Sequence, residues 1–83
     1  MKLIYFAWLR ERVGRSEEEL DLPPEVMTVG DLMAWLSRRG EGYAYAFEKP
    51  QAVRAALDKV HAGPGARIAG AKEVAFFPPM TGG

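Results

Sequence analysis

Side chains that commonly perform catalysis are scarce in this sequence. His61 is the single histidine and cysteine is absent, which excludes a thiol nucleophile, a disulfide and a cysteine-based zinc site. Ser16 and Ser37 lie in no motif that supplies a general base, so we expect no Ser/His/Asp triad. His61 reads more simply as a solvated or interface residue than as a metal ligand. The acidic run Glu17–Glu19 reads more simply as a solvated strand start than as an acid–base pair.

The end of the sequence offers a different group, a terminal carboxylate. Residues 76–83 read FFPPMTGG, two aromatic residues followed by a Pro-Pro pair and a closing Gly-Gly. Pro78–Pro79 favours an extended backbone that leaves a sheet, whereas Met80–Thr81 has no core position to fill. Gly82–Gly83 has no Cβ and could pass through a narrow channel. The plain interpretation is a frayed terminus. Joined to an apolar strand and a stiff spacer, the tail instead predicts delivery of the Gly83 carboxylate into another protein's active site.

Length, composition and charge bound the class of protein. The 83 residues allow one domain, and 48% hydrophobic content is typical of a globular fold. Lys+Arg and Asp+Glu are both 11, so the net charge is zero, which argues against nucleic-acid binding. No signal-peptide cleavage site follows the N-terminal apolar run, and no run approaches the ~18–20 residues of a membrane span. We expect a soluble, cytoplasmic, single domain over residues 1–83, with 78–83 as an extended flexible tail and no membrane contact.

The N-terminal segment Lys2–Leu9, KLIYFAWL, is short and rich in aromatic and aliphatic residues, which favours a strand. Both phases of its alternation are apolar, and the chain is too short to cover both faces of a sheet. One face is therefore expected to be kept for a partner. The predicted docking face consists of Ile4, Phe6 and Trp8 from this strand and Phe77 from the last one. The alternative is that these residues belong to the core.

Polar residues and prolines mark the next two elements. Arg10–Glu17 predicts a connection that turns at Gly14, and Glu18–Leu22 predicts a second strand, hairpinned to the first and stopped by two prolines. Thr28–Gly40 is the clearest helix. Its expected signals are an N-cap at Thr28, a first-turn acid at Asp31, an apolar stripe of Val29, Leu32, Met33 and Leu36, basic residues Arg38 and Arg39, and a left-handed stop at Gly40.

The second half of the chain is less regular. Gly42–Pro50 alternates like a strand, but a loop with a short helical turn fits equally well. Ala52–Ala62 could be a helix by propensity or a hairpin that bends at Asp58–Lys59, and we prefer the hairpin because it completes a sheet. Glu73–Pro79 predicts the last strand, ended by proline. Central first and last strands with a helix across one face give a small α+β roll.

Three segments carry a resemblance to a known family. EVAFFPPMTGG resembles the C-terminus of the small subunit of molybdopterin synthase, a ubiquitin-like sulfur carrier. KLIYFAWLRERVG is similar to that family's first strand and following turn, and TVGDLMAWL falls where the family has its helix. The resemblance spans essentially the whole sequence. It implies a β-grasp fold, a mixed sheet with one main helix across one face, and it supports the hairpin at Asp58–Lys59.

The resemblance also implies a mechanism. A ubiquitin-activating-type adenylyltransferase uses ATP to adenylate the Gly83 carboxylate, and sulfur from a donor such as a cysteine desulfurase system displaces AMP to leave a thiocarboxylate. The tail then enters the synthase large subunit and gives its sulfur to the cyclic pyranopterin precursor, and two such transfers form the dithiolene that holds molybdenum. This implies a carrier subunit of a heterotetramer, with no active site or bound cofactor of its own.

Three other functions remain open from the sequence. A thiamine-pathway sulfur carrier would share the terminal Gly-Gly but not FFPP. A ubiquitin-like modifier would be conjugated to lysines through the same terminus. A plain interaction domain would have a tail without a chemical role.

Overall fold

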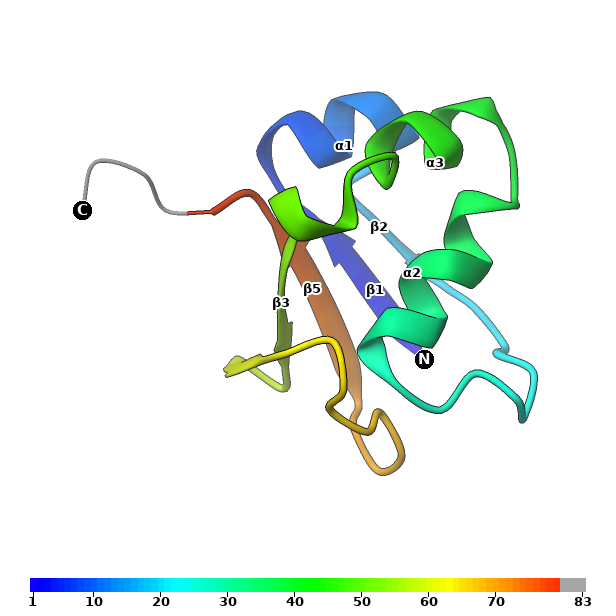
Figure 1. Cartoon of the computed structure of the whole chain (residues 1–83), viewed down its shortest axis with the longest axis vertical. Coiled ribbons are helices and arrows are strands. Elements are labelled where there is room, and N and C mark those ends of the chain that lie inside the picture. Colours follow the sequence, from blue (N-terminus) through cyan, green and yellow to red (C-terminus); the bar gives the residue numbers. More distant parts are fainter. Residues whose placement is uncertain (80–83) are drawn as a thin grey trace.

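The structure, a computed structural model, describes residues 1–79, which fold into one mixed sheet with helices packed on it (Figure 1). The strands are β1 (Lys2–Tyr5), β2 (Glu17–Glu19), β3 (Arg54–Leu57), β4 (Val60–Ala62) and β5 (Glu73–Phe77). The helices are α1 (Ala7–Val13), α2 (Val29–Ser37) and α3 (Glu41–Ala46), followed by a 3-10 turn over Pro50–Ala52. Within this part of the chain, no helix has the length and apolar composition needed to cross a membrane.

The first and last strands form the centre of the sheet, as predicted. The strand order is β2-β1-β5-β3-β4, with β1 and β5 parallel and the other pairs antiparallel. In the parallel pair Tyr5 lies opposite Phe76, and the Phe6 N–H donates to the Phe76 carbonyl at 3.0 Å. Because parallel strands end at the same side of a sheet, the end of β1 lies beside the point where the chain leaves β5.

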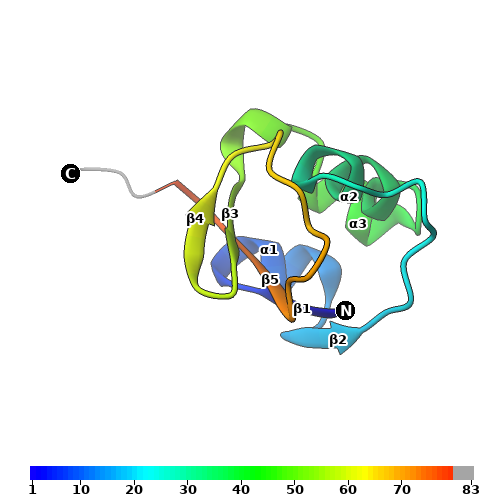
Figure 2. The same ribbon diagram turned by 90° about the horizontal axis from the view of Figure 1, so that it is seen from below.

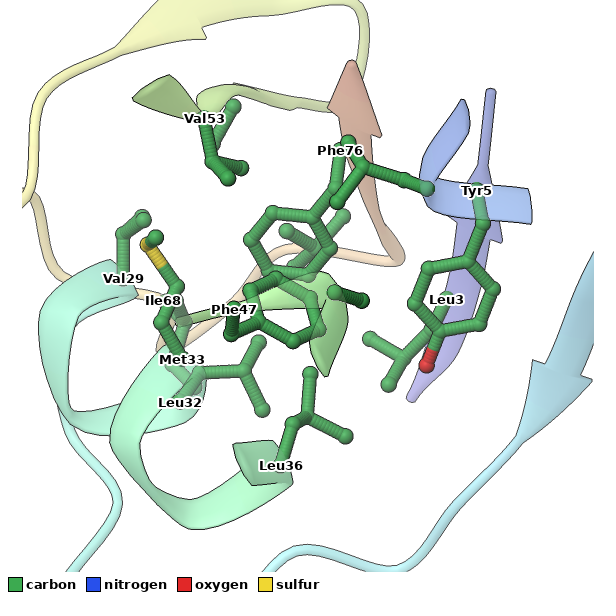
Figure 3. Close-up of a cluster of buried hydrophobic side chains, with 14 of the residues drawn as sticks. Leu3, Tyr5, Val29, Leu32, Met33, Leu36, Phe47, Val53, Ile68 and Phe76 are labelled. Carbon is green, nitrogen blue, oxygen red and sulfur yellow. The ribbon is translucent and has the colours of Figure 1, made fainter. Parts of the chain in front are cut away.

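The core lies between the sheet and α2 (Figure 3). Phe76 is fully buried, stacked on Tyr5 at a ring-centroid distance of 6.3 Å and met edge-on by Phe47 at 5.1 Å. The predicted apolar stripe of α2 is confirmed, since all four of its members are buried: Val29, Leu32, Met33 and Leu36. Burying such side chains stabilises the fold by roughly 1.5–3 kcal/mol each.

The predicted start of α2 is confirmed and its predicted end is wrong. The Asp31 N–H donates to Thr28 Oγ1 at 3.1 Å, and the Thr28 N–H donates to Asp31 Oδ2 at 3.2 Å, a reciprocal capping box. Hydrogen bonds from the Met27 and Thr28 backbone N–H groups hold the pKa of Asp31 below its ordinary value. Gly40 is no left-handed stop, because its φ of 161° is extended backbone and it directly precedes α3.

The prediction of one strand over Lys2–Leu9 is wrong beyond Tyr5. Phe6 is extended, Ala7 has a φ of 54°, and the chain then forms α1, which ends at Gly14 with a φ of 91°. Residues 7–13, AWLRERV, include several strong helix formers. The helical turn also carries Leu9 into the core, where its exposed fraction is 0%. Tertiary burial therefore prevails over the strand-like alternation.

Three other segments can be compared with their predicted structures. The second strand is Glu17–Glu19 rather than Glu18–Leu22, and it follows α1 rather than a tight turn. Gly42–Pro50 is not a strand: the short helix α3 ends at Ala46 and a loop follows, which confirms the alternative of a loop with a short helical turn. The hairpin is confirmed: β3 and β4 pair across Asp58–Lys59, which have φ values of 48° and 73°. Such positive φ values at both central residues are typical of the type I′ turns of two-residue hairpins.

A close helix contact predicts one sensitive position. A Cβ added to Gly42 of α3 would lie 2.5 Å from the carbonyl oxygen of Arg12 on α1. Gly42→Ala should therefore lower the free energy of unfolding by about 1–2 kcal/mol, because the clash outweighs the better helix propensity of alanine. Urea titration measures the change. Gly65→Ala is the control, since its Cβ would meet nothing within 4 Å. Equal stability of the two variants would show that α1 can shift freely.

Candidate functional site

The C-terminal tail leaves the body at the end of β5. Pro78 follows Phe77 directly and has no N–H to extend the ladder. Pro78–Pro79 projects away from the sheet beside the 3-10 turn that precedes β3 (Figure 1). Met80, Thr81, Gly82 and Gly83 lie outside the described residues, so their predicted role in the tail stays a prediction.

The sheet has one face covered by α2 and α3 and one face over which no element of residues 1–79 packs (Figure 2). This uncovered face carries an apolar row across three strands. Ile4 of β1 lies opposite Ala75 of β5, which lies opposite Ala56 of β3. Phe77 is two residues beyond Ala75 and therefore points to the same face at the tail end. Ala75 and Ala56 are themselves buried, so the accessible apolar surface of this row belongs to the half-buried Ile4 and Phe77.

The structure brings together three of the four residues of the predicted docking face. Ile4 and Phe77 are half-buried on the uncovered face, and Phe6, 48% exposed, lies at its tail end next to Phe76. Trp8 is separated from them because it lies on α1, where helical periodicity sets its direction. There its ring is covered by the guanidinium of Arg12 at 4.5 Å, and it packs against the edge of the core.

Two further residues flank the tail exit. The ring of His61 on β4 meets Phe77 edge-on at 5.3 Å, and Arg54 of β3 lies directly opposite Phe77. Both side chains are exposed. Sequence reasoning treated His61 only as a solvated or interface residue. The position of His61 follows from the register of the β3–β4 hairpin. His61 lies opposite Ala56, and its side chain is therefore on the uncovered face.

The strongest polar cluster lies elsewhere and holds the fold together. The hydroxyls of Tyr5 and Tyr43 each donate to Glu18 Oε2 at 2.7 Å, and Arg15 meets Glu18 Oε1 at 3.1 Å. The Glu18 side chain is only 6% exposed, yet its oxygens are well supplied with donors. The cluster ties β1, β2 and α3 together. Among residues 1–79, no three acidic or histidine side chains are grouped as metal ligands.

This cluster predicts a loss of stability in alkali. Burial and the hydrogen bond to Glu18 raise the pKa of Tyr5 well above its usual range. The folded protein thus keeps a proton that the unfolded chain loses near pH 10, so the free energy of unfolding falls as the pH rises above about 10. Tyr5→Phe should melt with a weaker pH dependence between about pH 9 and 11. Tyr45→Phe, at an exposed tyrosine, should keep the wild-type dependence. The same slope in all three proteins would contradict this account.

Solved structures with the same fold cover nearly the whole chain. SAMP1 from Haloferax volcanii is 27% identical, with a TM-score of 0.71 over 100% of this chain and 98% of that one. A second structure, H. volcanii small archaeal modifier protein 1, is 26% identical with a TM-score of 0.71, covering 96% and 97%. A Pyrococcus furiosus protein assigned as molybdopterin converting factor, subunit 1, is 25% identical with a TM-score of 0.67, covering 95% of each chain. These likenesses confirm the predicted β-grasp fold.

Comparison by sequence gives a family. No curated protein matches the chain, but the model of the ThiS family matches residues 3–83. The match includes both central strands, α2 and the Gly-Gly ending. The protein therefore belongs to the ThiS family and is a ubiquitin-like sulfur carrier or modifier.

Proposed function

We propose that this chain is the sulfur-carrier small subunit of molybdopterin synthase and that the terminal carboxylate of Gly83 carries the sulfur. The observation that carries the proposal is the FFPPMTGG ending and its position. Phe76 is buried in the core, Phe77 lies on the uncovered face, and Pro78–Pro79 leaves the sheet at that point. The likeness to the P. furiosus molybdopterin converting factor subunit supports the choice among sulfur carriers.

Loading of the tail requires an activating partner. A carboxylate is a poor acyl donor, so a ubiquitin-activating-type adenylyltransferase would use ATP to form the Gly83 acyl-adenylate and release pyrophosphate. The terminal sulfur of a persulfide, delivered by a donor such as a cysteine desulfurase system, then attacks the acyl carbon and displaces AMP to give an acyl persulfide. A thiol of the donor system reduces the S–S bond of this intermediate and is itself oxidised to a disulfide. The product is a thiocarboxylate. The sequence has no cysteine, which leaves the terminus as the available place to carry sulfur.

Delivery requires a second partner, the large subunit of the synthase. The thiocarboxylate is a soft anionic nucleophile, and a cationic pocket in that subunit would stabilise it beside the cyclic pyranopterin precursor. Sulfur passes to the precursor and the tail returns to a carboxylate with an oxygen from water. In this proposal the large subunit supplies the chemical groups that catalyse the transfer.

The distance that the tail can span sets where partners must dock. Four residues follow Pro79, and an extended chain spans at most ~3.3–3.6 Å per residue, so the carboxylate reaches about 13–14 Å from Pro79. Ordering each tail residue costs about 1–2 kcal/mol. A body contact of about 800 Å² per partner would offset that cost. The uncovered face with Ile4, Phe6 and Phe77 is the apolar surface beside the tail and is our candidate for this contact.

The test is a single-turnover reaction. Thiocarboxylated protein is mixed with a molybdopterin synthase large subunit and the cyclic pyranopterin precursor, and dithiolene formation is followed. We expect two equivalents of the loaded protein to be consumed per molybdopterin formed. If the loaded protein instead supplies sulfur only to a thiamine-thiazole synthase, it is the thiamine-pathway carrier.

A second function, protein modification, is favoured by one observation. SAMP1, whose full name in the second structure is small archaeal modifier protein 1, matches over the whole of this chain. A modifier would form an isopeptide bond between Gly83 and lysines of other proteins. Mass spectrometry of conjugates after tryptic digestion distinguishes the two functions, because only conjugation leaves the tail's terminal residues attached to a lysine.

A further inference from the structure

The two edges of the sheet are built differently. The edge strand β2 consists of Glu17, Glu18 and Glu19, and charged residues of this kind discourage pairing with another strand. The opposite edge strand, β4, consists of Val60, His61 and Ala62 and has neither a proline nor a formal charge. Val60 is 68% exposed although it is apolar. The β4 edge therefore lacks the protection that the β2 edge has.

The backbone of β4 is oriented for further pairing. Asp58–Lys59 form a two-residue turn. In such hairpins the two residues that flank the turn, here Leu57 and Val60, form a hydrogen-bonded pair, so the backbone N–H and C=O of each point toward the other strand. The alternation of an antiparallel ladder then turns the N–H and C=O of His61 away from β3. Because β4 is the last strand of the sheet (Figure 2), these groups face outward from its edge.

An apolar groove runs beside this edge on the helix-covered side. Its volume is about 730 Å³, and α2 forms one wall with Val29, Met33 and Ala34. Ala55 and Ala62, a cross-strand pair of β3 and β4, form part of its floor. A strand added to β4 would point alternate side chains toward this floor and the others toward the face that carries His61.

Three charged side chains lie around the edge: Arg54, Lys59 and Asp58. The Asp58 carboxylate is directed at the backbone, where its Oδ1 accepts from the N–H groups of Lys72 and Glu73 at 2.8 and 2.9 Å. Arg54 is the charged residue among those that line the groove, and Lys59 directly precedes β4. Both side chains are exposed, and within residues 1–79 neither forms an ion pair. A segment that lies along the edge would therefore be favoured by acidic residues at its ends.

We propose that β4 and this groove dock an extended segment of a partner protein, apolar at alternate positions and acidic at its ends. The segment would add a sixth strand to the sheet, exchange backbone hydrogen bonds with His61 and place its apolar side chains in the groove. Strand addition of this kind draws affinity from the backbone and specificity from pockets for alternate side chains. The proposal goes beyond the sulfur-carrier function and does not depend on the chemistry of the tail.

The test uses an acetylated peptide, Glu-Val-Thr-Val-Thr-Val-Glu, titrated into the full ¹⁵N-labelled chain. We expect saturable amide shifts at His61 and Gly63 on the edge and at Val53 and Ala55 beside the groove. Ala34→Gln, which places a larger polar side chain in the groove wall, should weaken binding at least tenfold. The matched control is Ala44→Gln, at an exposed alanine of α3 that does not line the groove, and it should bind as the wild type does.

Two modified peptides test the ladder and the charges. N-methylation should prevent binding at positions whose N–H faces β4 and have little effect at the positions between them, since ladder hydrogen bonds alternate. Replacing both glutamates by lysine should weaken binding several-fold. Absence of shifts at millimolar peptide, or shifts confined to the uncovered face around Phe77, would overturn the proposal. A concentration-dependent dimer without peptide, abolished by His61→Pro, would also overturn it, because the occupant would then be a second copy.

Discussion

Deleting Gly83 should abolish sulfur transfer while leaving thermal unfolding unchanged. The deletion moves the carboxylate short by ~3.3–3.6 Å, the reach of one extended residue. A misplacement of even ~1 Å can cost on the order of a hundredfold in a reaction that depends on positioning. Gly82→Val should have a similar effect, because a branched side chain obstructs the close approach that glycine permits. ATP-dependent thiocarboxylate formation and single-turnover conversion of the precursor measure the two steps.

The control for the valine substitution is Gly65→Val. A Cβ at Gly65 meets nothing within 4 Å, and its φ is outside the left-handed region. This variant should load and transfer sulfur at the wild-type rate. If the Gly83 deletion variant carried out both steps at the wild-type rate, the terminal carboxylate of Gly83 would not be the group that carries sulfur. The proposed carrier function would then be wrong.

Phe77→Asp should weaken binding of the large subunit by roughly thirtyfold or more while the domain stays folded. Phe77 is half-buried on the uncovered face, so the change removes an apolar anchor and places a hydrated carboxylate in an otherwise apolar contact. The adjacent Phe76, in contrast, is fully buried among Tyr5 and Phe47. Calorimetric binding and thermal melting, run in parallel, separate the two effects.

The matched control is Met27→Asp, at an apolar side chain that is 51% exposed and precedes α2. It lies outside the apolar row of the uncovered face and should leave binding within about twofold of wild type, as surface changes usually do. If Phe77→Asp unfolds the domain without a separate loss of binding, Phe77 belongs to the core and the proposed contact lies elsewhere.

The elements predicted correctly from the sequence are those whose local signals agree with their burial. In α2 the capping pair Thr28 and Asp31 and the apolar stripe indicate the same helix, and the structure has both. In β5 alternation, aromatic content and a following proline all favour a strand that ends at Phe77. The β3–β4 hairpin, preferred over a helix because it completes the sheet, has the expected bend at Asp58–Lys59.

The elements that the sequence did not reveal depend on tertiary contacts. α1 has seven residues and one fully buried side chain, Leu9, so its helical period is too short to stand out against the alternation of Lys2–Leu9. α3 packs closely against α1 at Gly42, a contact between segments that are distant in the sequence. Extending the first strand to Leu9 also led to the incorrect prediction that Trp8 and Phe6 lie on the same face of the sheet. His61 joined the candidate site only through the register of β4 with β3, which single-sequence patterns do not fix.

The most direct measurement of the central claim is the intact mass of the protein after incubation with its activating enzyme, ATP and a sulfide source. We predict an increase that corresponds to exchange of one oxygen for sulfur, dependent on ATP and located at Gly83 by fragmentation. The Gly83 deletion should show no such exchange. An unchanged mass with an active enzyme, or sulfur found at any position other than the terminal carboxylate, would contradict the proposal that this chain carries sulfur on its tail.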